Sequence, residues 1–331
     1  MERFAVIGAG AWGTALAMVA RRAGRSVILQ AHETEVAAAI NRDHQNPVYL
    51  PGITLDPSIE ATTDIPLAVD GADAVILVAP AQFVRAVTKQ MANGKRFDKP
   101  VLICAKGIEN ETCKLMTEVV AETLPAASQA VLSGPTFAIE VAREIPSAVT
   151  LASNDAKLAE QFIQAIGTPR FRPYRSDDPV GAEVGGAVKN VLAIACGIVQ
   201  GRCMGDNTRA ALITRGLAEI VRLGAAKGAR SETLMGLSGI GDLTLTCNAM
   251  QSRNFSLGVE LGKGRPLADI MGERKAVTEG VFSARAVIEL AGRLGVDMPI
   301  STAVNAIVNH GRNIDEVVDG LLARPFTKEI E

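Results

Sequence analysis

Short apolar runs alternate with helical stretches through the first half of the chain. The first run, residues 4–7, precedes a stretch of helical periodicity that ends near Arg22, and further runs follow at 27–29, 74–78, 101–104, 130–132 and 148–151. Strands that are apolar at nearly every position are typical of a parallel sheet covered by helices on both faces. The pattern predicts an α/β fold with a doubly wound sheet, and residues 171–174 as a further edge strand.

The pattern changes around Asp178, which is a favourable N-cap, and Pro179 suits the first helical position. No convincing strand follows. Helices are expected at about 179–200, 208–228, 253–262, 279–294 and 300–310, separated by glycine-containing turns. We therefore predict an N-terminal Rossmann domain over residues 1–178 and an all-helical C-terminal domain over residues 179–331. The apolar helices of the second half fit a homodimer interface and an internal core equally well.

Composition narrows the class of protein. The chain has 331 residues, of which 48% are hydrophobic and 21% charged, and its net charge is −2. These values describe an ordinary globular protein of about two domains, and the scattered Lys and Arg argue against a nucleic-acid surface. The longest apolar run, 191–199, is shorter than the roughly 20 residues that span a bilayer, and no signal peptide is expected. Five cysteines without C-x-x-C spacing predict free thiols, no metal site and a cytoplasmic protein.

A glycine fingerprint follows the first apolar run, and the only tryptophan of the chain, Trp12, lies inside it. A strand, a glycine turn and a helix in this order are the context of a dinucleotide-binding site. Gly8 would allow the tight turn, Gly10 would let the backbone approach a pyrophosphate, and Gly13 would let the helix pack closely on the strand. The phosphates would then meet the positive end of the helix dipole. The sequence therefore predicts a nucleotide cofactor.

The residues after the second strand fit NAD and NADP equally. An acidic residue about 20 positions past the glycines would bind the adenosine ribose, but Glu33 comes slightly late for this role. Glu33 is equally well explained as part of a solvated turn. A protonated His32 would tolerate the 2′-phosphate of NADP.

Loops at 78–83, 104–109 and 133–138 also leave the carboxyl ends of strands, where ligands bind in such folds. Lys106 is placed to meet a substrate oxygen or phosphate, although an ordinary surface lysine is the alternative. Residues 133–138 offer amides and a hydroxyl to an anion, or form a plain capped turn.

In the helical half, Lys189 shares one helix face with the small residues Ala182, Gly186 and Ala193. A buried lysine needs a partner or a lowered pKa, and a lysine of lowered pKa can act as a general base. A lysine that extends its amine into water is the alternative.

Further polar groups follow a glycine-rich turn that carries Asp242. Ser252, Arg253 and Asn254 place a hydroxyl, a guanidinium and an amide in a row. Arginine is the preferred side chain for a bidentate phosphate contact. Singly, each of these residues is more often a cap or a surface group. Together with the two lysines they suit a small phosphorylated hydroxy compound.

These motifs, in this order, resemble the bacterial type of NAD(P)-dependent sn-glycerol-3-phosphate dehydrogenases. Residues 8–17 look like the family's cofactor turn, in which an aromatic residue follows the second glycine by two, and 187–190 resemble the segment of its catalytic lysine. Ala11 departs from the family, because many members have Ser there. The resemblance implies catalysis by Lys189, substrate binding by Lys106, Gly134, Thr136, Lys189, Asp242, Ser252, Arg253 and Asn254, and cofactor binding by Gly8, Gly10, Ala11, Trp12, Gly13, His32, Lys106, Ala138, Arg253, Val277 and Glu279.

The reaction that the resemblance implies is reversible hydride transfer between NAD(P)H and dihydroxyacetone phosphate, giving sn-glycerol 3-phosphate for glycerophospholipid synthesis. Lys189 would move the proton of the C2 hydroxyl, Asp242 would orient Lys189 or a substrate hydroxyl, and Arg253 would hold the phosphate. A dehydrogenase of the 3-hydroxyacid or 6-phosphogluconate type is one alternative. A non-catalytic nucleotide sensor is another, but it leaves these three residues without a purpose.

Overall fold

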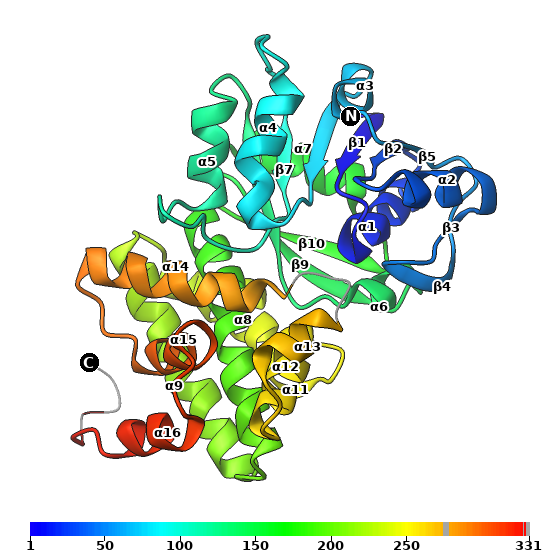
Figure 1. Cartoon of the computed structure of the whole chain (residues 1–331). Coiled ribbons are helices and arrows are strands. Elements are labelled where there is room, and N and C mark those ends of the chain that lie inside the picture. The colour runs from blue at the N-terminus through cyan, green and yellow to red at the C-terminus, as the bar shows by residue number, and fades with distance from the viewer. Residues whose placement is uncertain (274–277, 327, 329–331) are drawn as a thin grey trace. The chain divides into compact units, whose positions relative to one another are not determined.

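The computed structural model describes residues 1–273, 278–326 and 328, and it divides into two compact units (Figure 1). Unit 1 comprises Met1–Lys106 and Leu115–Ala182, and unit 2 comprises Gly107–Lys114 and Glu183–Glu331. The change from unit 1 to unit 2 falls in the first turn of helix α8 (Pro179–Gly201), whose N-terminus the sequence places at Asp178. The Asp178 carboxylate caps this helix by accepting a hydrogen bond of 2.9 Å from the amide of Gly181.

Unit 1 is built on an eight-stranded sheet in the order β10-β9-β8-β7-β6-β1-β2-β5. The strands are β1 (Arg3–Ile7), β2 (Ser26–Gln30), β5 (Glu60–Thr62), β6 (Ala74–Leu77), β7 (Val101–Ile103), β8 (Gln129–Ser133), β9 (Ser147–Ala152) and β10 (Phe171–Ser176). The chain runs from β1 outward to β2 and β5 and then returns to place β6 on the other side of β1. The strand order therefore reverses between β1 and β6, and ligands of doubly wound sheets bind at the carboxyl ends of strands at such a point.

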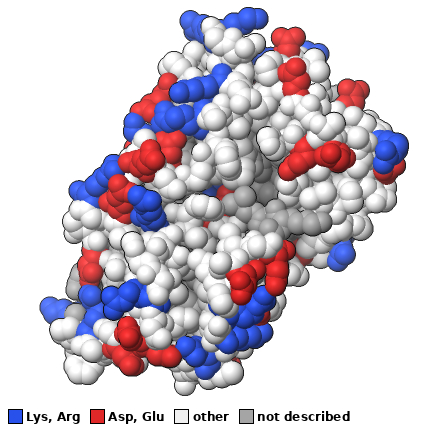
Figure 2. Space-filling model, viewed as in Figure 1, with Lys and Arg blue, Asp and Glu red and all other residues white. Residues whose placement is uncertain are grey.

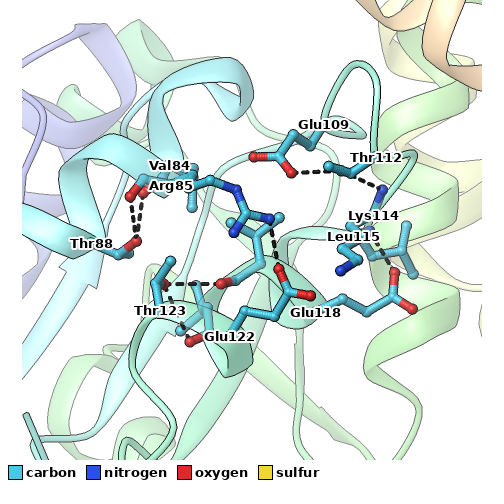
Figure 3. A network of polar contacts seen from close by, with 12 residues as sticks. Val84, Arg85, Thr88, Glu109, Thr112, Lys114, Leu115, Glu118, Glu122 and Thr123 are labelled. Atoms are coloured by element: carbon cyan, nitrogen blue, oxygen red, sulfur yellow. Dashed lines mark hydrogen bonds and ion pairs between the residues drawn. The ribbon is translucent and has the colours of Figure 1, made fainter.

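Helices cover both faces of this sheet, as the sequence predicts. They are α1 (Ala11–Arg22), α2 (Thr34–Asp43), α3 (Ile65–Asp70), α4 (Val84–Ala92), α5 (Met116–Thr123), α6 (Ala138–Ala142) and α7 (Ala156–Ile166), with a 3-10 turn at Ala81–Phe83. Phe4 packs into the core formed with α1, α2 and α7, whereas its neighbour Ala5 packs into the core formed with α3, α4 and α5. Successive side chains of a strand point to opposite faces, so one apolar strand supplies both cores. Figure 3 shows Arg85 of α4 directed at Glu122 of α5, with an ion pair of 2.8 Å.

The parallel arrangement predicted from the sequence holds for six strands and ends at β9. This strand is antiparallel to β8, and the edge strand β10 is parallel to β9, so the last two strands run against the other six. The connection from β8 to β9 contains only the five-residue helix α6. A parallel return usually needs a longer crossover with a full helix across the sheet. The edge position expected for residues 171–174 is confirmed by β10.

A small hairpin between α2 and β5 was not expected from the sequence. It pairs β3 (Gln45–Asn46) with β4 (Leu50–Thr54) in antiparallel register. Its strands are short and contain few apolar residues, so no periodic signal marks them. We call residues 44–55 the β3–β4 hairpin below.

From α8 onward, the described residues of unit 2 form helices and turns. After α8 it contains α9 (Asp206–Ala226), α10 (Ser231–Leu234), a π-helical turn (Leu237–Gly241), α11 (Asp242–Asn248), α12 (Arg253–Gly262), α13 (Leu267–Gly272), α14 (Glu279–Leu294), α15 (Pro299–His310) and α16 (Ile314–Leu322). Within the described ranges, α8 is the one helix long and apolar enough to cross a membrane by length and composition. Its most apolar window is 94% buried, which is typical of the core helix of a folded protein.

The segment Gly107–Lys114 belongs to unit 2 although it interrupts the sequence of unit 1. Arg293 of α14 holds it by donating to the carbonyl oxygens of Thr112 and Glu111, at 2.9 and 2.7 Å. Ile108 and Cys113 are buried. Within the segment, the Thr112 hydroxyl donates to the Glu109 carboxylate at 2.6 Å (Figure 3).

Acidic and basic side chains are interspersed on the face seen in Figure 2. This distribution agrees with a net charge of −2. A nucleic-acid-binding face would instead show clustered Lys and Arg.

Candidate active site

The glycine turn joins β1 to α1, and its three glycines meet three different surroundings. Gly8 has φ +110°, and a Cβ there would lie 3.1 Å from backbone atoms of Val78 and Ala79. A Cβ on Gly13 would collide with the carbonyl oxygen of Gly8, so this glycine lets α1 pack directly on the turn. A Cβ on Gly10 would meet nothing within 4 Å. The turn is thus crowded on the protein side and open above Gly10, which suits a pyrophosphate at the N-terminus of α1.

The side chains that follow the second glycine belong to the core. Ala11 and Trp12, together with Ala138 at the start of α6, pack against one hydrophobic cluster of unit 1. The Trp12 ring lies 6.5 Å from the Phe171 ring, centroid to centroid. Its indole nitrogen is buried without a hydrogen-bond partner among the described residues. The backbone of Trp12 is therefore the part of this residue that belongs to the turn.

The turn after β2 carries His32 and Glu33. His32 is exposed, and Glu33 accepts a hydrogen bond of 2.6 Å from the Tyr49 hydroxyl. This hydrogen bond to the carboxylate, with partial burial, raises the pKa of Tyr49 to about 12. Glu33 is therefore held by the β3–β4 hairpin. A freely solvated turn, which the sequence fits equally well, does not describe its carboxylate.

Lys106 and the loop after β8 come together at one end of the sheet. The Lys106 ammonium donates to the carbonyl oxygen of Gly134 at 3.1 Å, and the Thr136 hydroxyl donates to the same oxygen at 3.3 Å. Gly134 has φ +151°, and a Cβ there would lie 3.0 Å from Cα of Val149. Three of the expected substrate residues thus share one carbonyl group in unit 1.

In unit 2, Lys189 is a buried lysine with partners. Its side chain is 8% exposed, and its ammonium donates to Asp242 at 2.5 Å and to the Thr246 hydroxyl at 3.1 Å. The Thr246 hydroxyl in turn donates to the backbone carbonyl of Asp242 at 2.6 Å. Asp242 is fully buried at the first position of α11. The alternative of a lysine extended into water is wrong, because its ammonium is held inside the unit by these two side chains.

Glycines let the backbone segments that carry Lys189 and Asp242 approach each other closely. A Cβ on Gly185 of α8 would collide with the carbonyl oxygen of Ser238, so α8 lies directly against the π-helical turn that precedes Asp242. Lys189 is four residues further along α8 and therefore on the same face as Gly185. Short π-helical segments are frequent at functional sites.

A second close approach joins α8 to α12. A Cβ on Gly197 would collide with the carbonyl oxygen of Phe255, and a Cβ on Gly258 with that of Ile194. Gly201 and Gly262 repeat this arrangement one helical turn later. The two helix backbones therefore touch, which fixes the N-terminus of α12 relative to α8.

The N-terminus of α12 carries the row of three polar residues. Ser252 is the N-cap, and its hydroxyl accepts from the amide of Phe255 at 3.2 Å. Arg253, at the first helical position, is exposed, whereas Asn254 is buried. The first amides of a helix have no intrahelical acceptor, so this end favours an anion such as a phosphate.

Asn254 also holds the neighbouring helices together. Its side-chain nitrogen donates to the Asn190 side-chain oxygen at 3.0 Å, and its oxygen accepts from the amide of Gly280 at 3.0 Å. Asn190 follows Lys189 on α8, and Gly280 follows Glu279 on α14. One amide therefore links three segments that carry expected site residues. Val277, expected to contact the cofactor, lies outside the described residues.

Sequence reasoning gave no role to Thr246, Asn190 or Asn46. Thr246 follows Asp242 by four residues on one helix, a spacing that places both on one face and could have revealed it. Asn190 stands beside Lys189, but nothing in the sequence marks its partner. Asn46 lies in the unexpected hairpin, and 37 residues separate it from the carbonyl that it binds.

Two buried thiols, Cys196 and Cys247, lie near the lysine and carboxylate pair. Burial raises the pKa of Cys247 well above its usual value, and the neighbouring Cys196 raises it further. The thiol of Cys247 therefore stays protonated near neutral pH and is not a nucleophile in this state.

Comparison with known proteins gives matches over both halves of the chain. Residues 3–159 match the family described as NAD-dependent glycerol-3-phosphate dehydrogenase N-terminus, and residues 178–319 match the corresponding C-terminus. The glycerol-3-phosphate dehydrogenase [NAD(P)+] of Parvibaculum lavamentivorans is 57% identical over 99% of this chain and 98% of that protein. The protein of the same name from Rhodospirillum rubrum is 56% identical over 99% of this chain and 94% of its own length.

A solved structure is similar over the same extent. The crystal structure of glycerol-3-phosphate dehydrogenase from Coxiella burnetii matches 98% of this chain and 99% of that chain, with a TM-score of 0.94 and 37% identity. The match covers the glycine turn and the helical half together.

Proposed function

The chain belongs to the family of NAD(P)-dependent glycerol-3-phosphate dehydrogenases and is therefore an oxidoreductase, and we propose how its own residues carry out the reaction. The reaction is the reversible reduction of dihydroxyacetone phosphate to sn-glycerol 3-phosphate, a precursor of glycerophospholipids. Bound NAD(P)H supplies the hydride. The roles of the residues follow from the two units taken separately.

Unit 1 binds the cofactor. The space above Gly10 and the N-terminus of α1 accept the pyrophosphate, because amides and the helix dipole favour negative charge there. Gly8 and Gly13 shape the turn, Ala11 and Trp12 contribute their backbone, and Ala138 opens the neighbouring helix α6. His32 would contact the adenosine end, and Lys106 would contact both cofactor and substrate.

Unit 2 carries the proton transfer. In the reductive direction the Lys189 ammonium gives a proton to the oxygen that develops on C2, and in the oxidative direction the amine takes it back. Asp242 and Thr246 hold the Lys189 nitrogen in place, so the proton donor does not have to be reoriented during the reaction. A positioned general acid or base typically contributes about 10²- to 10⁴-fold to the rate.

The phosphate of the substrate binds at the start of α12. Arg253 supplies a guanidinium that matches phosphate geometry, and Ser252 and Asn254 order the first turn around it. Gly134 and Thr136, which share a carbonyl with Lys106, would bind the remaining substrate oxygens. Glu279, at the first position of α14, would contact the cofactor.

One observation carries this assignment: a buried lysine whose ammonium is held by a buried carboxylate and a hydroxyl. A buried ion pair contributes little to stability, so its presence in the core favours a functional role. A nucleotide sensor without catalysis would not need it.

The test is an assay of dihydroxyacetone phosphate reduction with NADH and NADPH side by side, followed by the loss of nicotinamide absorbance. We expect turnover of dihydroxyacetone phosphate with the reduced cofactors. In a second assay that supplies NAD+ or NADP+ and follows the gain of nicotinamide absorbance, we expect no turnover of 3-hydroxyacids or 6-phosphogluconate. If only a hydroxyacid were turned over, the proposed substrate would be wrong. Cofactor binding without turnover of any compound would favour the nucleotide sensor.

We also propose a cytoplasmic location, which suits the five free cysteines. A homodimer is a further proposal. Because α8 is buried within the single chain, the interface of such a homodimer would have to use other helices.

A further inference from the structure

Asn46, in the β3–β4 hairpin, is a buried amide with a full set of partners inside the glycine turn. Its side-chain nitrogen donates to the carbonyl oxygen of Ala9 at 2.8 Å and to the Thr14 hydroxyl at 2.9 Å. Its side-chain oxygen accepts from the amide of Tyr49 at 3.1 Å. Asn46 and Thr14 are both completely buried. The hairpin therefore reaches into the turn through one side chain.

The contact with Ala9 determines how the next peptide group is oriented. The carbonyl of Ala9 and the amide of Gly10 belong to one planar trans peptide bond, so they point in opposite directions. Because Asn46 holds the carbonyl toward the interior, the Gly10 amide N–H is directed to the other side. The backbone beside this peptide is also uncrowded, because an added Cβ on Gly10 would meet nothing within 4 Å.

We propose that Asn46 is a positioning residue for the nicotinamide cofactor, an inference that rests on the proposed function. It holds the Ala9–Gly10 peptide so that an amide donor, and not a carbonyl oxygen, faces the pyrophosphate. A reversed peptide would place a negative oxygen against a negatively charged ligand. Asn46 itself does not touch the cofactor, because its amide atoms are occupied by Ala9, Thr14 and Tyr49.

The hairpin adds a second fixed point on the same side of the sheet. Tyr49 is three residues after Asn46, and its hydroxyl holds Glu33 in the turn after β2. The segments that follow β1 and β2 are thus held by neighbouring residues of one hairpin. Both segments lie at the carboxyl ends of strands, where a dinucleotide extends in such folds.

The test compares Asn46→Asp with Asn41→Asp. Asp at position 46 keeps the acceptor for Tyr49 but replaces the donor that holds Ala9. Asn41 makes an equivalent two-sided contact elsewhere, because it donates to the carbonyl of Ala61 at 2.9 Å and accepts from its amide at 2.7 Å. Asn46→Ala removes the same donor without adding charge and serves if the Asp variant fails to fold.

The readout is the Kd for NADH and NADPH from the fluorescence of Trp12, which is the only tryptophan of the chain and lies in the turn. We expect the Asn46 variants to raise this Kd at least about tenfold, the scale of one buried hydrogen bond lost. The kcat at saturating cofactor and the KM for dihydroxyacetone phosphate should change less than about threefold, and Asn41→Asp should behave like wild type.

Three results would overturn the proposal or its premise. Equal Kd values for wild type and both Asn46 variants would remove the positioning role. If kcat and thermal stability of the Asn46 variants fell while the KM values for cofactor and substrate both rose, Asn46 would be a structural residue only. If wild-type protein bound neither NADH nor NADPH, the proposed function itself would fall, and this inference with it.

Discussion

Replacing Gly10 with alanine separates the binding role of the glycine turn from its folding role. Gly10 has φ −66° and ψ 179°, an extended conformation that any residue adopts. An added Cβ meets nothing within 4 Å, so alanine fits the fold without a ligand. The methyl group would occupy the space in which the pyrophosphate has to approach the backbone.

Two effects on stability nearly cancel. Gly10 is the N-cap of α1, and alanine is a poorer N-cap than glycine by about 0.5–1 kcal/mol. Replacing glycine by alanine at a compatible position gains about 0.4–1 kcal/mol by restricting the unfolded chain. The free energy of unfolding should therefore change by less than about 0.5 kcal/mol, and Tm by less than about 2 °C.

The effect on binding should be much larger. Holding a phosphate away from the turn costs at least one hydrogen bond to a charged group, which contributes about 1.5–3 kcal/mol. This loss corresponds to a Kd for NADH or NADPH that is about 10- to 100-fold higher. Isothermal titration calorimetry measures the Kd, and a thermal melt measures Tm.

The matched control is Gly13→Ala. A Cβ there collides with the carbonyl oxygen of Gly8, so α1 has to move and both stability and binding should fall. If Gly10→Ala bound the cofactor as wild type does, the pyrophosphate would not lie above Gly10. If Gly10→Ala unfolded as readily as Gly13→Ala, the open space would not exist in the folded protein.

Four further outcomes follow from other parts of the chain. Lys189→Ala should lower kcat with dihydroxyacetone phosphate by about 10²-fold or more, and a near-normal kcat in steady-state assays would remove its role in proton transfer. Arg253→Lys keeps the charge but loses the planar fork, so the KM for dihydroxyacetone phosphate should rise about tenfold with a smaller change in kcat, and an unchanged KM would speak against a bidentate phosphate contact. The Glu219 carboxylate accepts hydrogen bonds from the first amides of α15, at 2.5 and 3.1 Å, so Glu219→Ala should lower the free energy of unfolding by about 2–4 kcal/mol in urea titrations while both KM values stay unchanged. The pKa of Tyr49 is raised to about 12, so its hydrogen bond to Glu33 should stabilise the fold fully below pH 10, the approximate pKa of an unfolded tyrosine, and this contribution should be lost as the pH rises through 12. An absorbance titration should show a tyrosine ionising near pH 12 in wild type and not in Tyr49→Phe.

The long elements could be predicted from the sequence because each buries a continuous apolar face. The helices expected at 253–262 and 279–294 appear with those limits, and the first strand appears at Arg3–Ile7. Strand direction carries no such signal, so the reversal at β9 could not be foreseen. The β3–β4 hairpin was missed because its short strands depend on tertiary contacts, such as that of Asn46, and not on a periodic pattern.

A candidate site could be proposed from the sequence as a set of residues, but the contacts between these residues could not. The order of the motifs pointed to Lys189, Asp242 and Arg253. The sequence did not show that Lys189 is buried against Asp242, because 53 residues separate them and a solvated lysine fits the same helix pattern. Small residues were the useful signal, since Gly185 brings α8 onto the turn before Asp242.

The segment Gly107–Lys114 bears on how such a protein can be recombined. The polypeptide leaves unit 1 after Lys106, contributes eight residues to unit 2 and re-enters unit 1 at Leu115 before its last departure at Ala182. A chimera made by one fusion at Ala182 would therefore pair the segment Gly107–Lys114 of one parent with the Arg293 of another. Exchanging unit 2 intact takes three junctions, at Lys106, Lys114 and Ala182. The two units therefore cannot be exchanged as two consecutive pieces of the gene.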